Sequence, residues 1–328
     1  MYNECGDIMI TLSKIAKLAH VSVSTASKAF SMSNEVSAET REMIFDIAKQ
    51  HGCFKKYYRA KYPKYVIAVI CPELGSRYYA DALSVIQKRL AEHNCEMCVA
   101  SANFSVDAKR ELLEYYDKHT EVDGFIVIGK GLENYTNINL PVATVFSYGF
   151  AYEAISVNCE CMDAFSEAMG YFIAKGIKEI GFISELNTQK SLDMFKKLHM
   201  EKFGFVNEDL ISVTDERFEK GGYEAMEKYF VKGNIPRAVM CAYDHMALGA
   251  IRCIYDHGLS VPEDIAIMGG DEVYESKYLN PRLSSIDTHI DRACIIATDA
   301  LIEHLHGNYA EVKTSVKATL NLRKSTEL

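Results

Sequence analysis

A chain of 328 residues exceeds the usual size of one domain, so its length predicts two or three compact units. Hydrophobic residues make up 48% and charged residues 25%, which is ordinary for a soluble globular protein. No stretch approaches the ~20 apolar residues that a membrane span needs. The first ten residues carry Glu4 and Asp7 and lack an apolar core segment. We therefore expect no secretory signal peptide, no membrane partner and a cytoplasmic protein.

The charge is distributed unevenly along the chain. The formal net charge is −9, which by itself argues against a nucleic-acid partner. Residues 1–64, however, hold ten basic and six acidic residues, a net of +4, and the other 264 residues carry −13. A basic terminal segment on an acidic body is typical of a nucleic-acid-binding head, although a short segment can also reach this balance by chance.

Three short helices are predicted between residues 11 and 50, each preceded by a hydroxyl residue that can cap it. Thr11 precedes the first helix, Ser22 the second and Ser37 the third. Apolar residues recur behind each cap at helical spacing, which predicts one buried face per helix. These positions are Leu12, Ile15, Ala16 and Ala19, then Ala26, Ala29 and Phe30, then Met43, Ile44, Ile47 and Ala48. A three-residue turn between the first two helices is typical of a helix-turn-helix unit.

The second predicted helix, residues 23–30, is short enough to enter the major groove of DNA. Lys28 can donate to guanine, and the methyl groups of Val23 and Thr25 can contact thymine. The hydroxyl groups can bind phosphates or bases. The outward positions are Val23, Ser24, Thr25, Ser27 and Lys28. Spacing alone is equally compatible with an ordinary three-helix subdomain that binds nothing.

The run from Thr11 to Ser22, followed by residues 25–28 and 36–41, resembles the head of the LacI/GalR (lactose-repressor) family. The resemblance implies that the head binds a double-stranded DNA operator and that Thr11 and Ser22 belong to its DNA-binding set. Three residues depart from the family pattern, which usually has an acidic residue at Lys14, a glycine at His20 and an arginine at Lys28. None of these changes removes a groove-facing group.

The segment from residue 55 to residue 64 contains five basic residues, three tyrosines and no acidic residue. Such a stretch can follow phosphates or enter a minor groove, or it can be a solvated linker. In the resembling family this segment is a hinge helix that places a leucine in the minor groove. Tyr62 stands at that position, and Pro63 disfavours a helical conformation there. The candidate minor-groove residues are Lys55, Lys56, Tyr57, Arg59 and Tyr62.

Beyond residue 65, apolar strands alternate with amphipathic helices in two successive series. This alternation predicts an α/β body of two doubly wound lobes with a cleft between them. The predicted divisions are a helix-turn-helix domain at 1–54, a hinge at 55–64 and the body at 65–328. The resemblance implies a periplasmic-binding-protein-like body whose chain crosses between the lobes three times. It predicts a first lobe of about 65–157 and 288–312, and a second of about 158–287 and 313–328.

The resemblance extends over most of the body, at residues 243–250, 259–266, 269–272, 281–286 and 322–326. It implies that a small, sugar-like effector binds between the lobes. Asp244 and Asp271 match effector-contacting positions of the family, and a carboxylate accepts two hydrogen bonds from vicinal hydroxyl groups. Tyr79, just before a helix predicted at residues 81–93, aligns with an aromatic residue that can stack on a ring. Asp244 can also cap the helix that follows it. The candidate effector residues are Tyr79, Phe146, Glu160, Ser191, Asp244 and Asp271.

Two of these positions depart from the family. Ser191 replaces an arginine that commonly binds sugar, which removes a rigid multi-donor group, and Glu160-Cys161 replaces Asp-Asn. Hexose or pentose specificity therefore does not carry over. The cleft is predicted to bind an unusual effector or none.

Two other classes of protein share parts of this pattern. A nucleotide-dependent enzyme would need a phosphate-binding loop, but Gly129-Lys130-Gly131 is not one, and we predict no catalytic, metal or cofactor site. The cysteines, Cys95 with Cys98 and Cys159 with Cys161 included, are interpreted as structural thiols. A periplasmic-type sugar receptor would have the body without the head. The combination of both parts favours a homodimeric transcription regulator, a repressor by resemblance.

Overall fold

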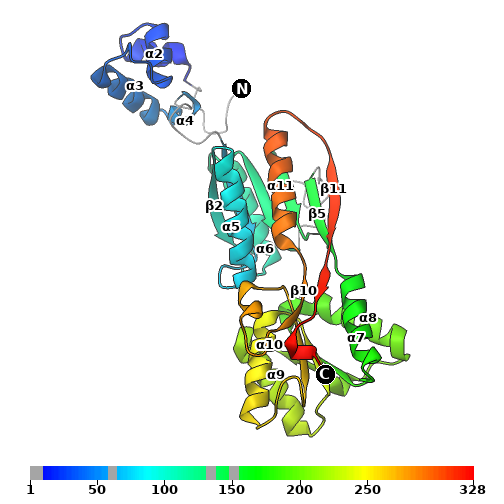
Figure 1. Cartoon of the computed structure of the whole chain (residues 1–328). Helices are drawn as coiled ribbons and strands as arrows, with labels where there is room; N and C mark the ends of the chain where they lie inside the picture. The colour runs from blue at the N-terminus through cyan, green and yellow to red at the C-terminus, as the bar shows by residue number, and fades with distance from the viewer. Residues whose placement is uncertain (1–9, 58–64, 131–137, 148–154) are drawn as a thin grey trace.

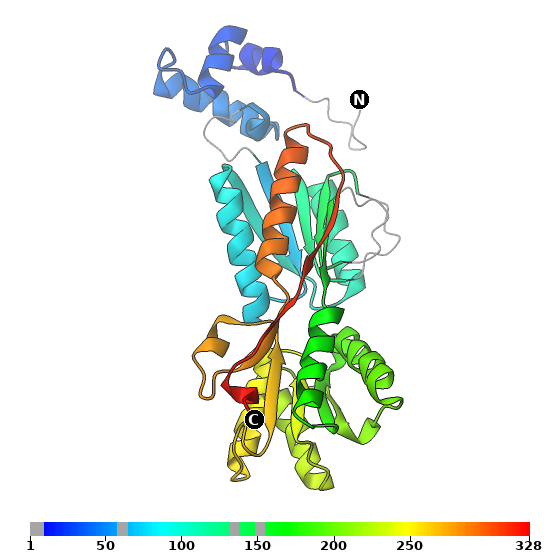
Figure 2. The ribbon, with the colours of Figure 1, turned by 45° about the vertical axis from the view of Figure 1, so that its right-hand side comes forward.

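The computed structural model describes residues 10–57, 65–130, 138–147 and 155–328. The chain forms a small helical head followed by two α/β lobes arranged end to end (Figure 1). The C-terminal segment, red in both views, runs along the body from the first lobe to the second (Figure 2). Among the described residues, no helix is long and apolar enough to cross a bilayer.

The head consists of α1 (Leu12–Leu18), α2 (Val23–Phe30), α3 (Ala38–Gln50) and α4 (Phe54–Tyr57). The three predicted caps are confirmed, because the side chains of Thr11, Ser22 and Ser37 each accept a backbone N–H of the first turn. The buried core of the head is separate from that of the body. It consists of Ile10, Ile15, Ala19, Ala29, Phe30, Val36, Ile44 and Ala48.

Two details of the head differ from the expectation. Met43 was predicted on the buried stripe of α3, but its side chain is exposed. His20, in the turn between α1 and α2, has a φ of 53°, a left-handed conformation that favours glycine. The turn therefore imposes the backbone conformation for which the resembling family usually uses glycine.

The first lobe is a six-stranded parallel sheet of order β11-β5-β4-β3-β1-β2. Its strands are β1 (Tyr65–Cys71), β2 (Cys95–Ser101), β3 (Gly124–Ile128), β4 (Val142–Val145), β5 (Ile155–Glu160) and β11 (Val312–Lys317). Its helices are α5 (Arg77–Glu92), α6 (Val106–His119) and α11 (Ile290–Leu305). In β1, Ile67 and Val69 share a core with α5 and α11, whereas Ala68 and Ile70 share one with α6. Burial on both faces explains the continuous apolar run of this strand.

The second lobe has a sheet of order β12-β10-β9-β8-β6-β7, in which only the β10–β12 pair is antiparallel. Its strands are β6 (Ile180–Glu185), β7 (Ile211–Thr214), β8 (Ala238–Cys241), β9 (Ala266–Gly270), β10 (Ser284–Asp287) and β12 (Thr319–Asn321). Its helices are α7 (Met162–Ala174), α8 (Gln189–Phe203), α9 (Phe218–Lys232) and α10 (Asp244–Asp256). Short 3-10 turns lie at Leu186–Thr188, Glu208–Leu210, Tyr274–Lys277 and Lys324–Thr326.

Helices α9 and α10 lie in backbone contact because each contributes a glycine at the crossing. A Cβ on Gly222 would lie 1.9 Å from the carbonyl oxygen of Met246, and a Cβ on Gly249 would lie 1.9 Å from that of Glu219. No larger residue fits at either position without separating the helices. This contact fixes the start of α10 against the sheet that borders the interlobe region.

The chain passes between the lobes three times, after β5, after β10 and after β11. The predicted lobe limits need two corrections. β5 continues in the first sheet to Glu160, beyond the predicted limit at 157. β11 pairs in parallel with β5 from Val312 to Lys317, so this strand belongs to the first lobe and not to the second. Sheet pairing determined both limits, because the sequence does not reveal which strands are neighbours.

Candidate functional site

The outward face of α2 presents small polar and apolar side chains to solvent. Val23 is 46% exposed, and Ser24 and Ser27 are also exposed. Thr25 is half-buried, and its hydroxyl group lies 2.8 Å from that of Ser22. The opposite face, Ala26, Ala29 and Phe30, is buried in the head. The buried face thus anchors α2 in the head core, and among the described residues the predicted reading face stays exposed to solvent.

Lys28, predicted to contact DNA, forms an ion pair with Glu35 in the loop between α2 and α3. Both side chains are substantially exposed. An exposed pair of this kind contributes about 0–1 kcal/mol, so the ammonium group can exchange Glu35 for a phosphate or a base at low cost. The loop itself is held by Arg41, which donates to the carbonyl oxygens of Ser33 and Val36.

Tyr57 was predicted to contact the minor groove, but the structure places it in the head core. Its hydroxyl group donates to the carbonyl oxygen of Ile10 at 3.0 Å, and its ring lies 5.2 Å from the ring of Phe30. Packing of α4 therefore extends the head to residue 57, beyond the predicted limit at 54. Of the other hinge candidates, Lys55 and Lys56 belong to α4. Arg59 and Tyr62 lie outside the described residues.

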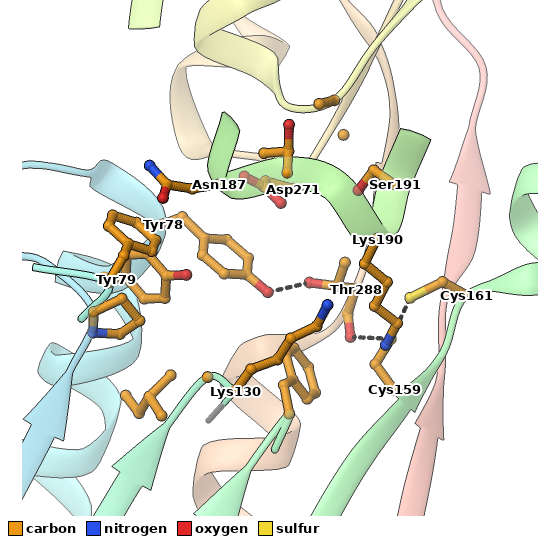
Figure 3. A pocket seen from close by; sticks show the side chains of 18 of the residues that line it. Tyr78, Tyr79, Lys130, Cys159, Cys161, Asn187, Lys190, Ser191, Asp271 and Thr288 are labelled. Carbon is orange, nitrogen blue, oxygen red and sulfur yellow. Dashed lines mark hydrogen bonds between the residues drawn. The ribbon is translucent and has the colours of Figure 1, made fainter. Parts of the chain in front are cut away.

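A cavity of about 340 Å³ lies between the two lobes. This volume is within the range of ~300–1,000 Å³ that is typical of small-molecule sites. The first lobe contributes residues of α5, the ends of β3 and β4, and Phe104, while the second contributes the start of α8, the end of β9 and the crossover residue Thr288. Figure 3 shows side chains from both lobes converging on this space.

Four of the six predicted effector residues line the cavity: Tyr79, Phe146, Ser191 and Asp271. Tyr79 lies inside the first turn of α5, which begins four residues earlier than predicted, and not before the helix. Phe146 and Asp271 follow the ends of β4 and β9 with φ values of 57° and 92°. The carboxyl ends of parallel strands thus supply two of the four, as expected for a doubly wound fold.

Asp244 and Glu160 do not line the cavity, in contrast to the prediction. The Asp244 carboxylate is fully buried and accepts hydrogen bonds from the Val273 N–H and from the hydroxyl groups of Ser276 and Ser285. It does not cap α10 either, since no side-chain cap is present at the start of that helix. Glu160 is exposed and accepts from Ser315. Alternation along the strand turns Glu160 away from the cavity and its two neighbours toward it.

Burial raises the pKa of both aspartates, of which Asp244 is fully buried and Asp271 partly exposed. For Asp244 the pKa rises to about 7, although its three hydrogen bonds lower it in part. For Asp271 the pKa lies well above its usual value because of burial, with a further contribution from Asp244. A neutral Asp271 carboxyl group can donate a hydrogen bond into the cavity as well as accept one.

Of the residues that the structure describes, three lysines line the cavity, and none was among the predicted site residues. Lys130 follows β3 in the first lobe, and Lys190 lies in the first turn of α8 in the second. Lys109 is buried and donates to the carbonyl oxygens of Ile128, Gly129 and Lys130, and burial lowers its pKa to about 8. The position of Lys130 after a buried strand was the available signal, since the ends of parallel strands line such clefts.

Cys159 and Cys161 also line the cavity, although the sequence interpretation was structural. Their sulfur atoms lie 2.9 Å apart, on the segment where β5 leaves the first lobe for α7. Their hydrogen bond raises the pKa of Cys159 and lowers that of Cys161. Lys190 is close enough to favour the thiolate form of both.

Arg217 joins the lobes next to the cavity. From the start of α9 its guanidinium group donates to the Glu73 carboxylate of the first lobe, with one N–O distance of 2.8 Å. It also donates to Glu185 of the second lobe at 3.3 Å. The rings of Phe104 and Phe218 lie 4.7 and 4.6 Å from the guanidinium carbon. We call Glu73, Arg217 and Glu185 the interlobe ion pair cluster; its two carboxylates are buried.

Two protein-family models match separate parts of the chain. "Bacterial regulatory proteins, lacI family" matches residues 11–54, and "Periplasmic binding protein-like domain" matches residues 169–326. Among curated proteins, the probable HTH-type transcriptional repressor ExuR of Bacillus subtilis (strain 168) is 25% identical over 319 residues, covering 90% of this chain and 91% of that protein. The HTH-type transcriptional regulator GalR of Streptococcus thermophilus is 27% identical over 343 residues, covering 97% and 100%.

Solved structures share the fold over nearly the whole chain. The lac repressor dimer bound to operator and the anti-inducer ONPF has a TM-score of 0.73 at 20% identity, covering 97% of this chain and 99% of that one. The complex of the transcriptional regulator CelR with cellobiose has a TM-score of 0.66 at 22% identity, covering 96% and 99%. The head and the two lobes therefore occur together, in this order, in proteins of known structure.

Proposed function

Because the chain belongs to the LacI/GalR family of DNA-binding transcription regulators, we propose that it is a repressor whose operator affinity depends on a small molecule bound between its lobes. The observation that carries the proposal is the presence in one chain of an exposed, capped α2 and a cavity of about 340 Å³ between two lobes. The relatives named above are regulators, and the proposal assigns the chain no catalytic activity.

We propose that two copies bind one operator. An isolated head offers a single short reading helix, which covers few base pairs. A homodimer places two such helices about 34 Å apart on successive major grooves of a near-palindromic site. The lac repressor structure similar to this chain is a dimer bound to operator, which supports the same arrangement here.

The reading residues of the proposal are Ser24, Ser27 and Val23, which are exposed on α2, together with Lys28 after it leaves Glu35. Thr11, Ser22 and Thr25 hold the helix ends and add polar groups near the phosphates. Lys55, Lys56, Arg59 and Tyr62 stay predictions for the minor groove and the phosphates beside it.

The interlobe ion pair cluster supports the coupling between cavity and head. Arg217 contacts carboxylates of both lobes and lines a smaller pocket next to the cavity. Tyr79, Asn187 and Asp271 line both the pocket and the cavity. A ligand there changes the balance between lobe arrangements if it binds one of them better. A change in lobe arrangement in a dimer alters the spacing of the two heads and hence the operator affinity.

The decisive experiment is selection of bound DNA from a genomic fragment library, followed by mobility shifts on the selected site. We expect a near-palindromic site and binding that weakens steeply with salt. Ser27→Glu places a carboxylate on the reading face and should reduce operator affinity on the order of 100-fold. Lys197→Gln changes the net charge equally on the exposed surface of α8 and serves as the matched control. Equal affinity for random DNA, or an unaffected Ser27→Glu variant, would refute the proposal.

A further inference from the structure

We propose that the effector is an anion, a small polyhydroxylated molecule with a carboxylate or phosphate group that binds between Lys130 of the first lobe and Lys190 of the second. The inference rests on the proposed function only in taking the interlobe cavity as the effector site. It adds the charge class of the effector, which neither the fold nor the comparisons specify.

The charge of the cavity lining is the first observation. The ionisable residues of the described lining, cysteines and tyrosines apart, are Lys109, Lys130, Lys190 and Asp271. Burial raises the pKa of the Asp271 carboxyl group, and the three lysines outnumber this one acidic group in either of its protonation states. The lining is therefore positive inside a body whose formal charge is −13. Cations concentrated in a narrow cavity raise the local concentration and the affinity of anions.

The placement of the two outer lysines is the second observation. In Figure 3 the Lys130 side chain extends from the first lobe toward Thr288, and Lys190 extends from α8 toward Cys159 and Cys161. They reach the same space from opposite lobes. Two like charges facing one another oppose closure of the lobes, and an oxyanion between them converts that repulsion into attraction. An anion bound here would therefore favour the closed arrangement.

Lys109 holds Lys130 in place. Its ammonium group is buried and donates to three consecutive carbonyl oxygens, the last of which belongs to Lys130. These bonds fix the backbone at the end of β3, from which the Lys130 side chain enters the cavity. Lys109 is thus a positioning residue, and its charge adds to the positive potential of that wall.

The rest of the lining fits the neutral part of such a ligand. Asn187, Ser191 and the carboxyl group of Asp271, all from the second lobe, can bind hydroxyl groups of the ligand. The hydroxyl groups of Tyr78 and Thr288 lie 2.8 Å from each other at the cavity wall. Tyr79 and Phe146 offer aromatic surface for a carbon skeleton. The volume of about 340 Å³ suits a molecule of monosaccharide size.

Matched pairs of ligands test the charge class directly on the full-length protein. The pairs are galacturonate with galactose, glucuronate with glucose, gluconate with sorbitol, and glucose 6-phosphate with glucose, with inorganic phosphate alone as a further arm. Thermal unfolding and titration calorimetry measure binding. At least one charged member should bind more than about 100-fold tighter than its neutral partner, since each charge-assisted contact contributes about tenfold to 100-fold. The sugar acids, the sugar phosphate and inorganic phosphate together show whether the bound anionic group is a carboxylate or a phosphate.

Variants assign the effect to the two lysines. Lys130→Gln and Lys190→Gln should each weaken binding of the charged ligand about tenfold to 100-fold, since each removes one charge-assisted contact. Lys197→Gln, on the outer surface of α8, is the control and should leave affinity unchanged. The neutral partner should bind equally to all four proteins.

The inference is overturned if no charged member binds, if a neutral member binds as tightly as its charged partner, or if the double variant Lys130→Gln/Lys190→Gln retains full affinity. Operator binding is measured separately on the same samples. A charged ligand that binds through both lysines but leaves operator affinity unchanged would leave this inference intact and refute the proposed coupling. The two failures are therefore distinguishable.

Discussion

The head and the interlobe cavity differ in how their functional residues are brought together. In the head, the cap at Ser22 and the reading face of α2 lie within nine consecutive residues, and local hydrogen bonds and one small core place them. In the cavity, Tyr79, Lys130, Lys190 and Asp271 come from four separate segments of the two lobes. A site built on one helix depends on local sequence, whereas a site built between lobes depends on sheet order and crossovers.

The largest expected effect is a loss of stability at Asp244. It tests whether this carboxylate stabilises the second lobe through buried hydrogen bonds instead of binding the effector. Asp244→Ala leaves the Val273 N–H and the Ser276 and Ser285 hydroxyl groups without their buried acceptor. We expect a loss of about 3 kcal/mol or more in the free energy of unfolding of the body, measured with urea. Glu160→Ala, at an exposed carboxylate, should cost less than about 0.5 kcal/mol. Similar losses for both variants would show that the Asp244 carboxylate does not stabilise the body more than an exposed carboxylate does.

The second prediction concerns pH and the cavity. The folded pKa of Asp271 is raised, so its carboxyl group is neutral below that pKa and becomes a carboxylate above it. Affinity for an anionic ligand should therefore be greatest at low pH, once the ligand itself is ionised, and fall as pH rises through this pKa, by up to about tenfold per pH unit. Asp271→Asn should abolish the part of the decline that lies below the pKa of Lys109, about 8, because an amide does not titrate and Lys109 is still charged there. A wild-type affinity that is flat with pH, or an unchanged slope in the variant, would contradict this assignment.

The third prediction distinguishes Lys28 bound to DNA from Lys28 paired with Glu35. Lys28→Gln should weaken operator binding about tenfold and reduce the slope of log affinity against log salt by about 1. Glu35→Gln frees Lys28 from its ion pair and should leave affinity equal or slightly higher. Mobility shifts over a salt series measure both. If Glu35→Gln weakens binding as much as Lys28→Gln, the ion pair itself is what the operator complex needs.

A smaller effect is expected at the turn between α1 and α2. His20 has a φ of 53°, so His20→Gly relieves the left-handed strain of a residue with a Cβ, partly offset by the greater entropy of glycine in the unfolded chain. The head should gain up to about 1 kcal/mol in stability, measured by thermal unfolding. His20→Ala is the control, since it keeps the strain while removing the ring. Equal stability of both variants would show that the turn is unstrained.

The smallest effect tests the connection between the two regions. Glu73→Gln removes one carboxylate from the interlobe ion pair cluster and should change the ligand-dependent ratio of operator affinities by roughly threefold, a modest coupling energy. Glu92→Gln removes a carboxylate from the Arg89 pair inside the first lobe and should not alter the ratio. The comparison requires the same ligand and operator in both variants. An equal change in both would assign the effect to net charge alone.

Much of the fold follows from local patterns that the sequence contains. The three caps of the head and the alternation of strands and helices are confirmed, because capping and burial periodicity act over a few residues. The start of α5 differs by four residues, which moves Tyr79 into the helix. The helix begins after Ser76, whose side chain forms no capping hydrogen bond, and helix ends are the part of an element that local patterns define least well.

The candidate site was only partly predictable. Asp271 was placed in the cavity by motif resemblance, and the structure agrees. Asp244 was placed there by the same resemblance, but its carboxylate is directed at Ser276 and Ser285 inside the second lobe. A motif specifies which residue follows a strand and not the direction of its side chain. Lys130 and Lys190 carried no motif. The position of Lys130 after a buried strand was a local signal, but the convergence of the two side chains on one cavity was visible only in the structure.

By itself, the sequence determined the helix-turn-helix head, the two α/β series and the charge contrast between head and body. Each of these features depends only on residue types and on their spacing over a few positions. The tertiary structure alone decided that Tyr57 belongs to the head core, that β11 belongs to the first lobe, and that lysines from opposite lobes face one cavity. The physical reason is that these features depend on contacts between residues distant in sequence, which local propensity does not encode.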